Sequence, residues 1–258
     1  MAIVSNNPIL DRLFYDQAAV EYYNSLPLEH FMESTPQATQ RKITLESFDL
    51  IHAARPDIRC YNELLIQYPV STIHDIARVV PDNLVVVHSQ PIRGTKSFNT
   101  PFEDARPFLV LEYVSEENQH KDYVENMGRY EKHLKVPYYL LFEPEKQQLL
   151  VHKLSTAKKK YVSVKPNAQD RLEIPELELE VGMLDEWVRY WFRGKLLPLP
   201  AELASELEET KRQLRKSQRQ TRVAEEQAQA ERTARQALEA ELERMRAELK
   251  QFKDGNGV

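Results

Sequence analysis

The chain has 258 residues, of which 41% are hydrophobic and 29% are charged, and its formal net charge is -5. This length predicts one domain of about 100–200 residues with an added segment. No apolar run approaches the roughly 18 residues of a membrane-spanning helix, the single Cys60 excludes an internal disulfide, and no Cys/His cluster has zinc spacing. Because the first residues also lack a signal-peptide pattern, we expect a soluble, cytoplasmic protein.

The composition changes near residue 200. All 15 prolines lie at or before Pro200, and the following segment has no glycine before Gly255. The acidic balance argues against a protein that coats nucleic acid through bulk charge, although a local patch suffices for an enzyme that touches DNA. The expected parts are an N-terminal extension over 1–40, a folded domain over 41–200, a coiled-coil helix over 201–253 and a disordered tail over 254–258.

Two helices and two strands are expected in the first half of the chain. Apolar residues at helical spacing predict a helix from about Leu10 to Tyr23 and another from Thr44 to Ala54. β-branched and apolar runs predict strands over Tyr61–Tyr68 and Ile76–Val87, the second interrupted at Pro81. The connection from His88 to Pro107 is loop-like.

The second half predicts a sheet crossed by a helix. The expected elements are a strand over Phe108–Val114, a helix over Asn118–Lys135, strands over Pro137–Phe142 and Gln148–Leu154, and a closing amphipathic helix over Met183–Phe192. A strand, a crossover helix and further strands are typical of an α/β domain with a mixed sheet flanked by helices. A Gly-rich phosphate loop is absent from the pattern, which disfavours a nucleotide site.

Two acidic residues stand inside apolar runs. The run FLVLEYV contains Glu112 and alternates so that Phe108, Val110, Glu112 and Val114 share one face while Leu109, Leu111 and Tyr113 share the other. Asp82 follows Pro81 in the run IARVVPDNLVVV. A buried carboxylate is costly unless it is paired or bound to a metal, and two from neighbouring strands can share a hard cation such as Mg²⁺. The alternatives are a turn residue at Asp82 and a salt bridge at a strand end for Glu112.

The order of these motifs resembles the Uma-two family of putative restriction endonucleases, within the PD-(D/E)XK nuclease superfamily. The resemblance runs from about Tyr61 to Leu154 and includes the motifs Pro81-Asp82, PFLVLEYVS and VPYYLLFEP. It implies a restriction-endonuclease-like sheet and a divalent metal, Mg²⁺ or Mn²⁺, held by Asp82 and Glu112. The implied reaction is hydrolysis of DNA phosphodiester bonds, in which a bound metal activates water. A segment over 184–203 before a charged coiled tail resembles one subgroup.

The sequence departs from this family at the lysine that completes such sites. Val114 stands two residues beyond the strand acid, and Asn126 stands four residues after Asp122, where many family members have lysine. On a helix with about 100° per residue, Lys121 falls roughly 150–170° from the inward stripe of Tyr123, Met127, Tyr130 and Leu134. Lys121 reaches the site only if the helix starts later. The candidate catalytic residues are therefore Asp82, Glu112, Asn126 and Lys121.

The last segment repeats in heptads. Alternate spacing by four and three runs without interruption from Leu203 to Phe252, with leucines at both ends and polar or small residues in the middle. This predicts a self-associating coiled coil about 75 Å long at 1.5 Å per residue, and the alternative is a single charged helix. The cluster Lys158-Lys159-Lys160 is either a DNA contact or a solvated turn.

The sequence is consistent with three functions. The first is an active Mg²⁺-dependent DNA endonuclease that forms homo-oligomers and does not bind membranes. The second is a catalytically degenerate protein that keeps the nuclease fold and binds nucleic acid, which Val114 and Asn126 favour. The third is an assembly protein whose coiled coil performs the function.

Overall fold

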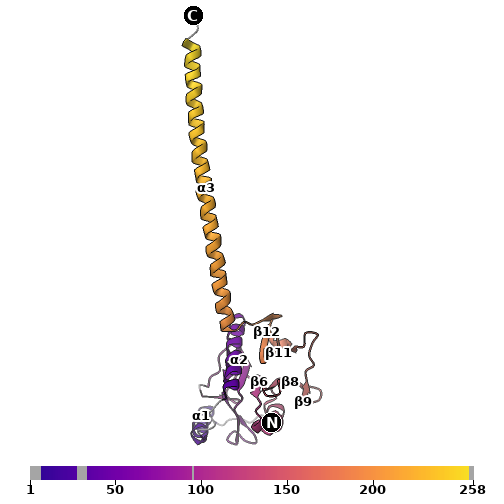
Figure 1. Ribbon diagram of the computed structural model, residues 1–258. Coiled ribbons are helices and arrows are strands. Elements are labelled where there is room, and N and C mark those ends of the chain that lie inside the picture. The colour runs from indigo at the N-terminus through magenta and orange to yellow at the C-terminus, as the bar shows by residue number, and fades with distance from the viewer. Residues whose placement is uncertain (1–6, 28–33, 95, 256–258) are drawn as a thin grey trace. The chain divides into compact units, whose positions relative to one another are not determined.

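A computed structural model describes residues 7–27, 34–94 and 96–255 (Figure 1). The chain divides into two compact units, Met1–Leu199 and Pro200–Val258. The second unit is the single helix α3 (Pro200–Gly255), which confirms the predicted helix, while its association with a partner stays a prediction. None of the helices in the described part of the chain is long and apolar enough to cross a membrane.

The first unit is a mixed α/β domain, as predicted. Its helices are α1 (Pro8–Ser25), α2 (Thr35–Ala54) and a crossover helix over 119–134. Its strands are β1 (Ile58–Asn62), β2 (Leu65–Pro69), β3 (Ile76–Val79), β4 (Asn83–Val87), β5 (Ser97–Asn99), β6 (Pro107–Tyr113), β7 (Tyr138–Glu143), β8 (Gln148–Ser155), β9 (Lys160–Ser163), β10 (Leu172–Ile174), β11 (Leu179–Leu184), β12 (Trp187–Phe192) and β13 (Lys195–Leu196).

The main sheet has six strands in the order β1-β4-β6-β7-β8-β9. Strands β6 and β7 are parallel, and every other pair in this sheet is antiparallel. A parallel pair needs a crossover, which the 119–134 helix supplies. Two smaller sheets, β10-β11-β12-β13 and β3-β2-β5, complete the unit.

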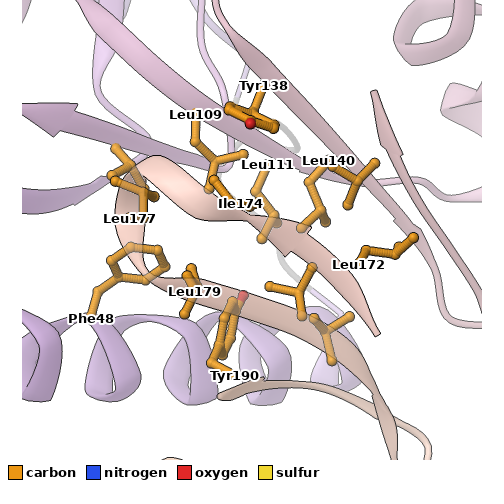
Figure 2. Close-up of a cluster of buried hydrophobic side chains, with 14 of the residues drawn as sticks. Phe48, Leu109, Leu111, Tyr138, Leu140, Leu172, Ile174, Leu177, Leu179 and Tyr190 are labelled. Carbon is orange, nitrogen blue, oxygen red and sulfur yellow. The ribbon is translucent and has the colours of Figure 1, made fainter. Parts of the chain in front are cut away.

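Each face of the main sheet has its own hydrophobic core. On one face, Leu111 of β6 and Leu140 of β7 pack with Phe48 of α2 and Tyr190 of β12 (Figure 2). On the other face, residues of β6 and β7 pack with Tyr130 of the crossover helix. Because both faces are covered, β6 and β7 are apolar on both sides, as their sequences indicate.

The alternation predicted for β6 is confirmed except at Phe108. Leu109, Leu111 and Tyr113 lie in the first core, and Val110 and Val114 lie in the second. Phe108 packs against the first core as well. The register of β4 and β6 shifts there, and such a bulge inserts one unpaired residue and turns its side chain to the other face.

The predicted strand over residues 61–68 is divided in the structure. Glu63 has a positive φ of 47°, between β1 and β2, and the two strands belong to different sheets. Strand β5 lies within the segment predicted as a loop. The interruption predicted at Pro81 is confirmed, since β3 ends at Val79 and β4 begins at Asn83.

The predicted closing helix over 183–192 is wrong. The segment is the hairpin of β11 and β12, in which Leu184 pairs with Trp187. Asp185 and Glu186 form the two-residue turn, with φ of 52° and 69°, and such turns require positive φ at both positions. The β-branched and aromatic residues of β12 favour a strand, and neighbouring strands override the helical spacing.

α2 begins nine residues earlier than predicted. Ser34 caps the helix by accepting a hydrogen bond from the Gln37 backbone N–H at 3.4 Å, and Pro36 stands in the first turn. Both features are typical of a helix start. The predicted boundary between residues 40 and 41 therefore falls inside α2, and the added turns place Gln37 and Arg41 near the sheet. Of the predicted tail over 254–258, residues 256–258 lie outside the described residues, and Gly255 still belongs to α3.

Candidate functional site

Asp82 and Glu112 face each other across two neighbouring strands. In the antiparallel register Asn83 pairs with Leu111, so Asp82 stands opposite Glu112. The Asp82 backbone N–H donates to Glu112 Oε2 at 3.2 Å, and the Tyr113 backbone N–H donates to Asp82 Oδ2 at 2.6 Å. These two hydrogen bonds fix both carboxylates at the same point of the sheet.

The crossover helix adds polar side chains beside this pair. Its segments over Lys121–Asn126 and Arg129–Leu134 are wound as a π-helix. Asn126 Nδ2 donates to Glu112 Oε1 at 3.2 Å and to Asp122 Oδ1 at 3.0 Å. Tyr130 OH donates to the same Glu112 oxygen at 2.7 Å. Glu112 therefore receives three hydrogen bonds, and a third carboxylate, Asp122, is brought next to it.

The Asn126 amide is held in one orientation. Arg129 Nη1 donates to Asn126 Oδ1 at 3.0 Å, which directs the NH₂ group toward the two acids. On the far side of the pair, Gln37 Nε2 donates to Asp82 Oδ1 at 3.2 Å. The carboxylates are thus positioned from α2, the sheet and the crossover helix together.

Burial and mutual repulsion favour the protonated forms of these acids. Burial, with the nearby charge of Asp122, raises the pKa of Asp82 from 3.8 to about 6. Burial raises the pKa of Asp122 to about 6 as well, against the attraction of Lys121. Burial and the charges of Asp82 and Asp122 raise the pKa of Glu112 well above 4.5. Clustered acids with raised pKa values are typical of functional sites.

These acids line a pocket of about 640 Å³ that also contains cationic side chains. Arg41 from α2, Arg78 from β3, and Lys121 and Arg129 from the crossover helix all contribute to its wall. Arg41 also pairs with Glu63 at 3.3 Å, and Arg78 lies over the Tyr22 ring. The pocket is lined by the three carboxylates together with guanidinium and ammonium groups. The guanidinium and ammonium groups are the ones that bind phosphates.

The structure brings all four predicted site residues together. Asp82, Glu112, Asn126 and Lys121 all line this pocket. Lys121 differs from its expected place, since its charge lowers the pKa of all three acids although the rotation argument put it on the far side. Uniform α-helical winding from residue 118 would turn Lys121 to the far side, whereas the helix is wound as a π-helix from Lys121 onward.

Several residues of the site were missed by the sequence analysis. Asp122 was treated only as a helix residue flanking the inward stripe, yet it is 3% exposed and contacts Asn126. Gln37 was placed in the N-terminal extension, although the Ser34 and Pro36 start signal could have extended α2 to include it. Tyr130 was assigned to the core, and its hydroxyl reaches Glu112.

Other predicted features do not belong to the site. The Val114 side chain, at the superfamily lysine position, is buried in the second core. Lys158 and Lys159 lie exposed in the turn between β8 and β9, and Lys160 is exposed at the start of β9; none of them lines the pocket.

The chemistry of the donors fits a hard divalent cation. In the described part of the chain no ion pair neutralises Asp82, Glu112 or Asp122, and no group of three or more His, Cys, Asp or Glu side chains is placed to hold a metal ion, so a cation would depend on the carboxylate pair alone. Mg²⁺ is usually bound through one or two carboxylates with water and substrate phosphate completing its shell, which suits an open pair. Each carboxylate oxygen has two lone pairs, so Glu112 Oε2 and both Asp82 oxygens, which accept one hydrogen bond each, keep acceptor capacity.

Comparisons with known proteins agree with the predicted resemblance. No curated protein matches the chain. Among solved structures, a putative nuclease of the DUF820 group from Anabaena variabilis is similar at 17% identity, with a TM-score of 0.45, over 60% of this chain and 82% of that chain. The family described as putative restriction endonuclease matches residues 14–184, more than half of the chain. The chain therefore belongs to the Uma2 family of putative restriction endonucleases.

Proposed function

We propose that this chain is a divalent-cation-dependent nuclease that hydrolyses phosphodiester bonds of DNA. Family membership supports a nuclease function in general. The observation that carries the proposal is the pair Asp82 and Glu112, fixed opposite each other by the register of β4 and β6 and open to a pocket of about 640 Å³. Asp82 and Glu112 would hold Mg²⁺ or Mn²⁺, which would polarise a phosphoryl oxygen and lower the pKa of the attacking water.

The protein's own groups would position the substrate around this pair. Arg41, Arg78 and Arg129 line the pocket and suit contacts to phosphate oxygens, because guanidinium groups bind phosphates in a bidentate manner. Asn126 is held by Arg129 with its NH₂ group toward the acids, so it keeps Glu112 and Asp122 in place. An amide supplies no charge and no base, so Asn126 is a positioning residue.

Lys121 is the candidate for the missing lysine. It is the one lysine among the described residues that line the pocket, and its charge acts on all three acids. We assign to it the role of orienting the attacking water or accepting its proton, which is worth about 10²–10⁴-fold in rate. Lys121→Met should therefore lower the nicking rate by at least about 100-fold while the protein stays folded, because the side chain is exposed.

Cleavage of supercoiled plasmid tests the proposal directly. The full chain should nick the plasmid with Mg²⁺ or Mn²⁺ and stop in EDTA. Asp82→Asn and Glu112→Gln should each abolish nicking, and Glu145→Gln, in an exposed turn, should retain the wild-type rate. Nicking by Asp82→Asn at the wild-type rate would show that the activity comes from elsewhere.

A degenerate nuclease fold is the second candidate. Buried Val114 and the amide of Asn126 occupy the two lysine positions of the family pattern, and this favours a protein that binds nucleic acid without cutting it. Calorimetric titration with Mg²⁺ separates the two, together with retention of labelled DNA on a filter. Binding of metal and DNA without any cleaved DNA would support the protein that binds without cutting. Cleaved DNA whose formation depends on Asp82 would exclude it.

A further inference from the structure

α3 exposes an apolar stripe along its length. Every described side chain from residue 201 to residue 250 is exposed. Eight large apolar side chains lie among them, between 39% and 65% exposed: Leu203, Leu207, Leu214, Val223, Leu238, Leu242, Met245 and Leu249. All except Val223 occupy the first and fourth positions, a and d, of one uninterrupted heptad repeat, with Leu207 at a and Leu203 at d. In a coiled coil, apolar residues at these positions form the seam that a second helix covers.

We propose that α3 pairs with α3 of a second copy as a parallel, in-register, two-stranded coiled coil. Charges beside the stripe support this arrangement. In a parallel pair, the residue before each a position (g) faces the residue five places later (e) on the other helix. Glu206 then faces Lys211, and Glu241 faces Arg246. None of the facing g and e pairs over the described side chains joins two like charges.

The antiparallel arrangement fits the sequence less well. Full antiparallel overlap faces each a position with a d position, so Leu242 meets Ser217 and Leu249 meets Thr210. In the same arrangement e faces e, which sets Lys211 against Arg246. The parallel, in-register pair instead sets each leucine against its own copy. Both the apolar contacts and the flanking charges therefore favour the parallel form.

The polar middle of the stripe fixes the register. Glu231 occupies a d position and Arg235 the next a position. In a parallel coiled coil each side chain on the stripe inserts between four residues of the other helix, so Glu231 reaches Arg235 of the second copy, and the reverse. A slip by one heptad sets Glu231 at the level of Leu238 and Arg235 at the level of Leu242, so each charged side chain then lies against a leucine of the other helix. Polar groups at such positions are a known way to specify register.

This pairing would join two copies of the Met1–Leu199 unit at the same end of the coil, because each copy is connected to α3 through Leu199 and Pro200. A shared tether raises the local concentration of one unit near the other. The inference does not depend on the nuclease proposal, since it rests on α3 alone.

Oxidative cross-linking of the full chain tests the orientation. Met245→Cys puts a thiol at a d position, and in the parallel form it should cross-link to its own copy on mild oxidation, giving a dimer on a non-reducing gel. Ser205→Cys, on the outer side of the helix, is the matched control and should stay monomeric, as should the wild type with Cys60 alone. Leu214→Cys, at an a position, should likewise cross-link to its own copy when it is oxidised alone. A dimer that forms only when the Leu214→Cys and Met245→Cys chains are mixed, and with neither chain alone, would establish the antiparallel form and overturn the proposal.

Sedimentation equilibrium of the same chain tests the association and the polar layer. The wild type should be a dimer at tens of micromolar, and a monomer at that concentration would overturn the proposal. Glu231→Arg should raise the dissociation constant by about tenfold or more, because four arginines then meet in two adjacent layers. The double variant Glu231→Arg with Arg235→Glu should restore the wild-type value, since the pair is only exchanged and both residues are good helix formers. Failure of this rescue would refute the contact between the copies.

Discussion

Replacing Asp122 by asparagine should stabilise the metal-free protein, and the gain should depend on pH. Asp122 is 3% exposed and its pKa rises from 3.8 to about 6, chiefly through burial. An acid with a raised pKa in the folded state binds its proton more tightly when folded, so the free energy of unfolding falls as pH rises from about 4 through about 6. The shift of about 2 units corresponds to about 3 kcal/mol at most.

Asparagine keeps the Oδ1 acceptor for Asn126 and removes the charge. In EDTA, urea denaturation should give Asp122→Asn a free energy of unfolding about 2 kcal/mol above wild type at pH 8 and nearly equal to wild type at pH 4. Glu116→Gln, which removes an exposed acid near the same helix, should show no such dependence on pH. A destabilisation of Asp122→Asn by equal amounts at both pH values would refute the reasoning and assign Asp122 a hydrogen-bonding role instead.

Three further changes test the fold and the site. Glu186→Gly should raise the free energy of unfolding by about 1 kcal/mol in urea denaturation, because Glu186 has a φ of 69° in a hairpin turn; in a helix the same change would lower it by about 1 kcal/mol. Tyr130→Phe removes the donor to Glu112 Oε1 and should cost about 1–3 kcal/mol by the same measurement. At pH 8, Mg²⁺ should raise the thermal unfolding midpoint of the wild type and should leave that of Glu112→Gln unchanged, because the cation is attracted by the ionised carboxylates of Asp82 and Glu112.

The sheet could be read from the sequence because its signals are local. The apolar runs around Asp82 and Glu112 predicted two buried strands. A strand that is apolar on both of its sides belongs in a sheet whose two faces are both covered, which leaves few other arrangements of the fold. The hairpin over 183–192 could not be read in this way. Its aromatic residues recur at a spacing that suits a helix as well as a strand. Residues 187–192 form a strand because the neighbouring strand Leu179–Leu184 pairs with them, and this pairing is not visible in the local sequence.

Local signals predicted only part of the candidate site. Asp82 and Glu112 follow from the strands, whereas the contribution of the crossover helix depends on how that helix is wound. A uniform α-helix would turn Lys121 away from the acids, and π-helical winding over Lys121–Asn126 changes which side chains share a face. No residue in that segment signals such winding in advance, since its sequence contains neither proline nor glycine.

Asn126 stands where the family pattern has lysine, on the side of the crossover helix that faces the acids. Because Asp122 and Asn126 both face Glu112, a lysine at 126 would stand among the acids as their counter-charge. With asparagine there, the counter-charge must come from elsewhere, and Lys121 acts on the same three acids from the start of the segment. A lysine introduced at 126 and Lys121 would therefore perform overlapping roles, so Asn126→Lys should restore nicking to a Lys121→Met variant if Lys121 replaces the lysine of the family pattern.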